Sequence, residues 1–212
     1  MNGRIKRLVS LLPKVNKLAD IGCDHGYLTL YSLLEGKCKT AVVSDVSEKC
    51  LSKAKKLLSS YVEKGLVTCN VSNGFNGVGK VDLAVIAGMG GEETKAILLN
   101  AEFLPDKLLL QPMKNTEKVR ETLIEKGYML KKDFVFLYKN KFYDVIYAEK
   151  GEDFLTPEEL EFGRDNVKNP SQDFIKKLEE EKKLILSVIN KDLGEKSRAE
   201  LNEKLKKIEK YV

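Results

Sequence analysis

The chain has 212 residues, of which 42% are hydrophobic and 33% charged, and its formal net charge is +5. This size allows one α/β domain with a small appendage, and no apolar run approaches the ~18 residues that a membrane-spanning helix needs. The N-terminus lacks the apolar segment of a signal peptide, and the four cysteines include no Cys-x-x-Cys pair and accompany a single histidine. We therefore expect a cytoplasmic protein with no membrane segment and no metal site.

Positive charge is concentrated in residues 1–150, which hold 24 Lys and Arg against 17 Asp and Glu, a net charge of +7. Residues 151–212 hold 13 against 15, a net charge of −2. A basic first part suits a polyanionic partner, although a modest excess of lysine is also ordinary surface.

Residues 4–12 have the apolar spacing of an amphipathic helix. The basic side chains of this segment are Arg4, Lys6 and Arg7. Two interpretations remain open: a helix that covers the core with its charged side in solvent, or a basic arm that contacts phosphate.

From residue 18 onward, short apolar strands alternate with helices. The pattern predicts strands at 18–22, 40–44, 67–71, 81–87 and 108–111, and helices at 27–35, 48–64, 92–100 and 117–126. Ser47 is the expected N-cap of the second helix, and Gly65 its end. Two further strands, at 129–138 and 142–149, have only a short link and should pair antiparallel. Apolar strands that are each followed by a helix predict an α/β fold with a mostly parallel seven-stranded sheet covered on both faces.

The pattern changes after Gly151. Thr156-Pro-Glu-Glu159 predicts a helix that runs to Asn169-Pro170, and Ser171 should cap a longer one with an apolar stripe. A last helix repeats apolar residues at heptad-like steps, so the two long helices should fold back at 192–194 as an antiparallel, coiled-coil-like hairpin. We expect two domains, residues 1–152 and 153–212.

Four loops at predicted strand ends should meet at one edge of the sheet, where such sheets bind ligands. In the loop after the first strand, Gly22 and Gly26 allow close approach of a nucleoside to the backbone. Asp24 occupies the place of the middle glycine of a dinucleotide-binding turn, and its carboxylate would repel a pyrophosphate. S-adenosylmethionine has no phosphate and carries a cationic ammonium and a sulfonium, which Asp20 and Asp24 could receive.

Other loop residues allow two interpretations each. Asp45, at the end of the second strand, could accept hydrogen bonds from ribose hydroxyls or cap the next helix. Asn73-Gly74 could hold the adenine edge or form a plain turn. His25 could shape the loop or contact the methionine end of the cofactor, and Cys23 reads as a small buried residue.

The motifs Asp-Ile-Gly-Cys-Asp-His-Gly-Tyr-Leu, Ser-Asp45-Val, Ala-Gly-Met-Gly-Gly91 and Leu-Leu-Leu-Gln111-Pro112 together resemble the bacterial tRNA (adenine-N1)-methyltransferases, the TrmK family. The resemblance covers essentially the whole chain. It implies a Rossmann-like class I methyltransferase domain that uses S-adenosylmethionine, a coiled-coil-like C-terminal domain, and tRNA as the substrate, modified at adenine 22. One departure is Ser72-Asn-Gly-Phe75, where the family pattern has an acidic Gly-Asp-Gly-Leu.

The loop residues and the family resemblance together indicate a set of site residues. The cofactor-binding residues are Asp20, Gly22, Asp24, His25, Gly26, Tyr27, Asp45, Val46, Asn73, Gly74, Ala87 and Gly88. The substrate-binding residues are Met89, Gly90, Gly91, Gln111, Pro112, Arg4, Lys6, Arg7 and Lys114.

Methyl transfer to adenine N1 uses a lone pair that is available at neutral pH, so no general base is needed. Catalysis would then depend on in-line alignment and on acceptors for charge that develops on the adenine. The carbonyls of Ala87–Met89 could accept from the adenine amino group, unless that loop only packs on the sheet, and Asp24 is the side-chain candidate for an electrostatic role. Two alternatives stay open: a methyltransferase for a small molecule or protein, and a non-catalytic adaptor. We expect a monomer, with a homodimer through the hairpin also open.

Overall fold

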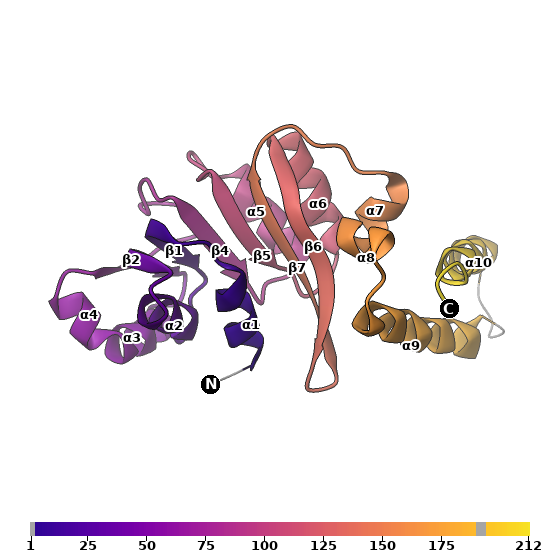
Figure 1. Ribbon diagram of the computed structural model, residues 1–212, viewed down its shortest axis with the longest axis horizontal. Coiled ribbons are helices and arrows are strands. Elements are labelled where there is room, and N and C mark those ends of the chain that lie inside the picture. The colour runs from indigo at the N-terminus through magenta and orange to yellow at the C-terminus, as the bar shows by residue number, and fades with distance from the viewer. Residues whose placement is uncertain (1–2, 190–193) are drawn as a thin grey trace.

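The computed structural model describes residues 3–189 and 194–212. A seven-stranded sheet forms its centre, and the C-terminal helices extend from one end of it (Figure 1). The strands are β1 (Val15–Ile21), β2 (Cys38–Asp45), β3 (Val67–Val71), β4 (Leu83–Ala87), β5 (Lys107–Gln111), β6 (Tyr128–Tyr138) and β7 (Lys141–Lys150). The helices around the sheet are α1 (Gly3–Leu11), α2 (Tyr27–Leu34), α3 (Glu48–Leu57), α4 (Ser59–Glu63), α5 (Gly91–Leu99) and α6 (Thr116–Glu125).

The strand order is β3-β2-β1-β4-β5-β7-β6. The first five strands are parallel, and β7 runs antiparallel between β5 and β6. This confirms the predicted mostly parallel sheet of seven strands and its antiparallel last pair. The order reverses at β1, which has β2 on one side and β4 on the other. The loops after β1 and β4 therefore flank the switch point, where open α/β sheets bind ligands.

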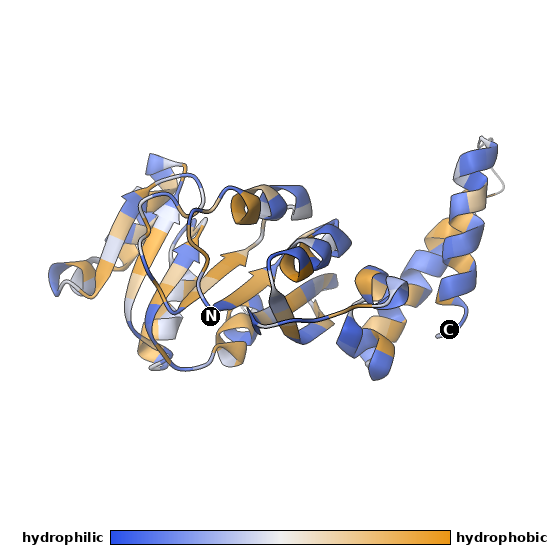
Figure 2. Ribbon diagram, turned by 90° about the horizontal axis from the view of Figure 1, so that it is seen from above, coloured by the Kyte–Doolittle hydropathy of each residue, from blue (hydrophilic) through white to orange (hydrophobic). Residues whose placement is uncertain are grey.

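The two faces of the sheet are covered by different helices, because successive residues of a strand point to opposite faces. In β4, Leu83 and Val85 join a core with α1, α2 and α3. Ala84 and Ile86 join the opposite core with α5 and α6. Figure 2 shows the strands as largely hydrophobic ribbons between these helices, as expected of strands buried on both sides.

The prediction of one helix over 48–64 is wrong in one respect. The segment forms two helices, α3 and α4, with a break at Leu58. Leu58 is fully buried and has φ −99° and ψ 13°, which leave the helical conformation. Burial of this side chain in the core outweighs continuation of the helix. Ser47 does cap α3, as predicted, because its hydroxyl accepts a hydrogen bond from the amide of Cys50 at 3.3 Å.

The helix predicted from 157 to Asn169-Pro170 is also two helices, α7 (Pro157–Phe162) and α8 (Arg164–Lys168). Thr156 caps α7 in a capping box with Glu159. The break lies at Gly163, which has a φ of 92°, and a Cβ atom there would lie 2.8 Å from Nη2 of Arg120. The glycine thus makes room for a guanidinium that the sequence pattern did not reveal.

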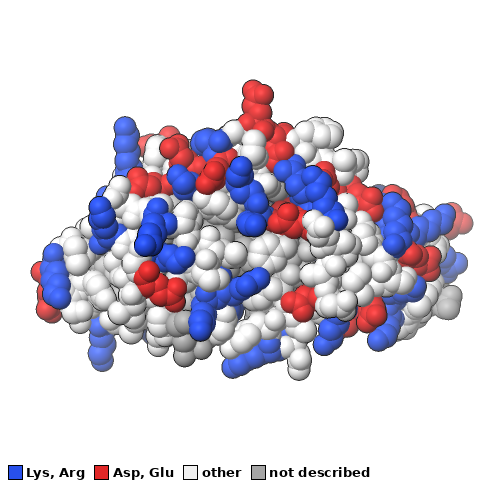
Figure 3. Space-filling model, viewed as in Figure 1, with Lys and Arg blue, Asp and Glu red and all other residues white. Residues whose placement is uncertain are grey.

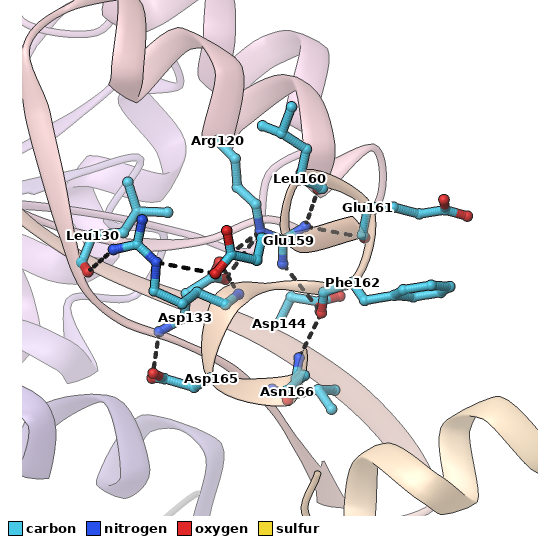
Figure 4. Close-up of polar contacts among 12 residues, drawn as sticks. Arg120, Leu130, Asp133, Asp144, Glu159, Leu160, Glu161, Phe162, Asp165 and Asn166 are labelled. Carbon is cyan, nitrogen blue, oxygen red and sulfur yellow. Dashed lines mark hydrogen bonds and ion pairs between the residues drawn. The ribbon is translucent and has the colours of Figure 1, made fainter. Parts of the chain in front are cut away.

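That guanidinium is the centre of a buried polar network (Figure 4). Arg120 is 1% exposed, and its Nε donates to both carboxylate oxygens of Asp133 at 3.0 and 2.9 Å. Its Nη1 donates to the carbonyls of Leu160 and Glu161 in α7, at 2.9 and 3.2 Å. The network therefore fastens α7 to α6 and β6.

Strand β6 is an edge of the sheet, and the C-terminal segment covers it. The amides of Asp133, Val135 and Leu137 alternate along the strand and would otherwise be unpaired. They donate to the side chains of Asp165 at 2.8 Å, Asn166 at 3.1 Å and Asp173 at 2.9 Å. Side chains from α8 and the next helix thus substitute for an eighth strand.

Helices α9 (Gln172–Val188) and α10 (Glu195–Ile208) form the C-terminal arm. Ser171 caps α9 as predicted, and Leu205 and Ile208 of α10 belong to one hydrophobic cluster with Leu178 of α9. Tyr211, just after α10, lies with its ring 5.4 Å from that of Phe174 at the start of α9 and donates to Glu158 at 2.9 Å, so the two helices run antiparallel. Of the predicted junction at 192–194, residues 192 and 193 lie outside the described residues. The domain division at 152/153 stays a prediction.

Within the described ranges, no helix combines the length and apolar character needed to cross a membrane. The same residues bring together no group of three or more His, Cys, Asp or Glu side chains that could hold a metal ion.

Candidate active site

The loop between β1 and α2 has an unusual backbone. Gly22, Asp24 and Gly26 have φ angles of 71°, 47° and 74°, a region that side chains other than glycine rarely adopt. The amides of Gly22 and Cys23 both donate to the carbonyl of Ser44, at 2.8 and 3.0 Å. These bonds bring the loop onto the end of β2, so that it curls around the switch point.

Asp45 joins this loop to the next one. Its Oδ2 accepts a hydrogen bond from the amide of Asp24 at 3.1 Å, and its Oδ1 accepts from the amide of Ser47 at 2.8 Å. The hydroxyl of Ser47, and not Asp45, caps α3. Because each carboxylate oxygen can accept more than one hydrogen bond, Asp45 retains acceptor capacity toward a ligand.

Asp20 lies at the base of the same site. It is 5% exposed, and its carboxylate accepts a hydrogen bond from the hydroxyl of Thr29 at 2.8 Å. Burial raises the pKa of Asp20 from 3.8 to about 6; the bonds from Thr29 oppose this shift, and the charge of Asp45 adds to it. A buried carboxylate of this kind favours a cationic neighbour.

A cavity of about 480 Å³ opens above these residues. Its lining includes seven of the predicted residues: Arg4, Asp20, Gly22, Asp24, His25, Tyr27 and Ala87. Sequence reasoning missed Ile5, Leu28 and Tyr31, and assigned Cys23 no role in the site. A signal for Tyr31 was present, since it follows Tyr27 by one helical turn and the two rings stack at 6.4 Å.

The loops after β4 and β5 are bonded to each other beside the site, and Ala87 at the end of β4 lines the cavity. The amide of Gly88 donates to the carbonyl of Gln111 at 3.0 Å, and the amide of Met113 donates to the carbonyl of Met89 at 2.8 Å. A Cβ atom on Gly91 would lie 2.2 Å from the carbonyl oxygen of Asn115. The glycine is therefore required for these two loops to meet.

Met89 reaches across the site toward the first loop, because a Cβ atom on Gly22 would lie 1.9 Å from its Cε. Lys114 packs on this loop, with its Cε 3.5 Å from the Cβ position of Gly90, but it lines a different hollow, between the β5–α6 loop, α7 and α9. The structure thus brings Ala87 and Met89 of this loop next to the first loop.

Arg4 connects helix α1 to the site. Its Nη1 donates to Oε1 of Gln111 at 2.6 Å, and its guanidinium lies 5.7 Å from the centre of the Tyr143 ring. Gln111 is 1% exposed and also donates to the carbonyl of Pro112 at 3.0 Å. The other two basic residues of this helix lie elsewhere: Arg7 packs over the ring of Phe134 at 5.6 Å and Lys6 is exposed.

Three of the predicted cofactor residues line a different hollow. Val46, Asn73 and Gly74 border a cavity of about 410 Å³ next to α5. The carbonyl of Gly74 accepts from the hydroxyls of Ser44 and Ser72, both at 3.4 Å. Val46, which lines this cavity, directly follows Asp45. Asp24, whose amide Asp45 binds, lines the first cavity. Asp45 therefore connects the residues of the two hollows.

The remaining side chains of the first loop offer no nucleophile. Burial raises the pKa of the Cys23 thiol far above its ordinary value, with the charges of Asp20 and Asp45 adding to the effect. The side chain of His25 is 44% exposed, and its Nε2 lies 3.7 Å from Oδ1 of Asp24 and 3.5 Å from Nζ of Lys53. The site therefore suits binding and alignment rather than covalent catalysis.

Comparison with known proteins gives a consistent result. Residues 18–211 match the family model described as TrmK, tRNA (adenine(22)-N(1))-methyltransferase. A tRNA (adenine(22)-N(1))-methyltransferase from Bacillus subtilis is 27% identical over 157 residues, which are 72% of this chain and 66% of that enzyme. The match thus spans just under two thirds of the length of that relative.

Two solved structures are similar over the full length of the chain. One is the M. capricolum TrmK in complex with S-adenosyl-homocysteine, with a TM-score of 0.90 and 25% identity, covering 100% of this chain and 97% of that one. The other is the B. subtilis M1A22 tRNA methyltransferase TrmK, with a TM-score of 0.88 and 23% identity, covering 100% and 98%. The second likeness, at its lower identity, shows a shared fold.

Proposed function

The chain belongs to the tRNA (adenine(22)-N(1))-methyltransferase family, and from this membership we propose that it transfers the methyl group of S-adenosylmethionine to N1 of adenine 22 in tRNA. The observation that carries the proposal is the cavity at the switch point. It is bordered by the buried carboxylate of Asp20, by Gly22, which admits a ligand to the backbone, and by Ala87 at the end of β4.

The residues present fit the cofactor. S-adenosylmethionine supplies an electrophilic methyl group on a sulfonium. Asp20 would receive the ammonium group of its methionine part, because a cation next to this carboxylate offsets the cost of burying the negative charge. Arg4 borders the same cavity and would pair with the methionine carboxylate, since a guanidinium binds a carboxylate through two parallel hydrogen bonds.

Asp45 would hold the ribose. It ends β2 and keeps acceptor capacity beyond its bonds to the amides of Asp24 and Ser47. A carboxylate in this place accepts from both ribose hydroxyls. Val46, Asn73 and Gly74, in the adjoining hollow, would then border the adenine of the cofactor. Asn73 stands where the family pattern has an aspartate, and its side-chain amide can both donate hydrogen bonds to the adenine and accept them from it.

The chain's part in the reaction is to align and to stabilise charge. The adenine N1 lone pair is nucleophilic without a base, so the site needs to hold N1, methyl and sulfur in line and exclude water. The carbonyls of Ala87 and Gly88 would accept from the amino group of the target adenine, whose charge grows as N1 is methylated. Asp24, at the mouth, is the side chain proposed for an electrostatic role. Residues 1–152 would form this catalytic domain, residues 153–212 a second one, and the protein would act in the cytoplasm.

The test is methyl transfer from labelled S-adenosylmethionine to three acceptors: unmodified tRNA, the same tRNA digested to nucleosides, and total cell protein. We expect label in the intact tRNA alone. Label in protein or in free nucleosides with none in tRNA would contradict the proposal. Binding of S-adenosylmethionine without transfer to any acceptor would favour a non-catalytic adaptor.

A further inference from the structure

Basic side chains gather on α1 and on the hairpin of β6 and β7. We name this surface the basic ridge and define it by Lys6, Arg7, Lys132, Lys139 and Lys141. All five side chains are exposed. Figure 3 shows Lys and Arg side chains over the lower middle of this face, where α1 and the tip of the β6–β7 hairpin lie in Figure 1.

The two segments that form the ridge contain few acidic residues of their own. Arg7 and Lys132 border a hollow that Asp165 and Asp173 also line, and these two carboxylates accept hydrogen bonds from the amides of Asp133 and Leu137. Residues 3–14 contain Arg4, Lys6, Arg7 and Lys14 and no acidic residue. Residues 131–141 contain four lysines and a single acid, Asp133, which is 1% exposed and bound to Arg120. A surface that keeps one sign of charge attracts a polyanion.

The turn between β6 and β7, which we call the prong, is a tight hairpin turn. Lys139 and Asn140 have φ angles of 48° and 57°, the pair of positive values typical of a tight two-residue hairpin turn. The hydroxyl of Tyr138 accepts from the amide of Gly3 at 3.0 Å, and Nζ of Lys139 lies 5.6 Å from the centre of the Tyr138 ring. The prong is therefore fastened to the start of α1.

The same helix connects the prong to the cavity. Arg4 follows Gly3 directly, borders the cofactor cavity and donates to Gln111. An RNA backbone that crosses the prong and α1 would thus pass within one helical turn of the cavity mouth. A target base could leave the stack there and enter the site.

A second, more voluminous hollow is a poorer place for RNA. It measures about 770 Å³ and lies between the β5–α6 loop, α7 and α9. Its lining has three lysines, Lys114, Lys177 and Lys204, against five acids, Glu117, Glu121, Asp144, Glu161 and Glu181. Two of these lysines are already paired, Lys177 with Asp144 at 3.0 Å and Lys204 with Glu181. A net negative groove repels phosphate.

We propose that the phosphate backbone of the tRNA binds to the basic ridge of α1 and the β6–β7 turn, and not in the groove between the sheet and the C-terminal arm. This inference rests on the proposed function for its choice of RNA. It gives the ridge a task that neither the cofactor site nor the fold accounts for.

The experiment measures tRNA affinity by filter binding between 50 and 200 mM salt. Each phosphate contact contributes about 0.7–0.9 to the slope of log affinity against log salt. The double variant Lys139→Gln, Lys141→Gln should lose two such contacts. Raising the salt from 50 to 200 mM lowers the affinity of both proteins, and the factor by which it falls should be about 7 to 12 times smaller for the double variant than for the unaltered protein.

Two matched double variants serve as controls. Lys64→Gln with Lys80→Gln removes the same charge from exposed positions far from the ridge in sequence and fold. Lys177→Gln with Lys204→Gln removes it from the groove. Both should keep the slope of the unaltered protein. All variants should bind S-adenosylmethionine equally, which shows that they are folded.

An unchanged slope in the ridge variant would overturn the inference, and so would an equal loss in either control. The proposed function fails on a different readout. If tRNA binding depends on the ridge but no methyl group is transferred to tRNA, the proposed function is wrong and the ridge proposal stands. If tRNA is methylated but the salt slope depends on the groove lysines, the ridge proposal is wrong and the proposed function stands.

Discussion

At the scale of single residues, Asp45 has a structural task as well as the proposed ribose contact. Its carboxylate binds the amides of Asp24 and Ser47 and so holds two loops in register. Asp45→Ala should weaken S-adenosylmethionine binding by about 1–3 kcal/mol, the cost of losing charge-assisted hydrogen bonds. Calorimetry measures this directly.

The control separates the two tasks. Ser47→Ala removes the cap of α3 and should lower stability by about 0.5–2 kcal/mol while leaving cofactor affinity unchanged. A cofactor analogue without the ribose 2′-hydroxyl should lose affinity for the unaltered protein and not for Asp45→Ala, because the partner is already gone. Equal losses in both proteins would count against the ribose contact.

Asp20 gives the site a pH dependence with a defined sign. Its pKa in the folded protein is about 6, above the ordinary 3.8, so between these values the folded state binds a proton that the unfolded state does not. The contribution of Asp20 to stability therefore falls as pH rises from about 4 to about 6, by about 3 kcal/mol in total.

The Asp20→Asn variant has no carboxyl group to ionise at this position, so it should not lose stability as the pH rises from about 4 to about 6. Without cofactor, the variant should be more stable than the unaltered protein at pH 7.5, and the advantage should shrink toward pH 4.5. Urea unfolding at both pH values checks this. The same difference at the two values would refute the assignment. With cofactor, the variant should bind more weakly at pH 7.5, because the ammonium group loses its counter-charge.

At the scale of elements, the C-terminal segment is attached by polar contacts to an edge strand. Arg120 and Asp133 are each 1% exposed and are bound to each other. Arg120→Met leaves Asp133 as a buried charge without its main partner, which should cost about 3–5 kcal/mol of unfolding free energy. Urea denaturation of the full chain is the measurement.

Two comparisons make this prediction sharp. Adding Asp133→Asn to Arg120→Met should restore part of the loss, because the buried charge is removed with its partner. Lys118→Met, on the same helix, breaks an exposed pair with Glu92 and should leave the unfolding midpoint unchanged. An Arg120→Met protein as stable as the unaltered one would show that the network contributes nothing.

At the scale of the whole molecule, the local pattern of the sequence predicts most of the fold. The strands are continuous apolar runs, and each loop at the binding edge carries its own glycine or acid, so their meeting follows from the topology of a parallel sheet. The caps at Ser47, Thr156 and Ser171 are local as well.

What the pattern could not predict depends on partners far away in the chain. Arg120 meets carbonyls 40 and 41 residues later, and the break at Gly163 exists because that guanidinium needs the space. The contact of Arg4 with Gln111 spans 107 residues. The covered edge of β6 also arises from side chains of later helices. None of these contacts has a periodic signal in the sequence.

The central claim is that this chain methylates adenine 22 of tRNA, and the most direct test changes that one base. Two transcripts of one tRNA, with A or G at position 22, are incubated with the protein and S-adenosylmethionine. Primer extension, which stops at N1-methyladenine, then maps the product. The account predicts a stop at position 22 of the A22 transcript, none in the G22 transcript, and strong reduction with Asp45→Ala. Equal methylation of both transcripts, or no methylated adenine in either, would contradict it.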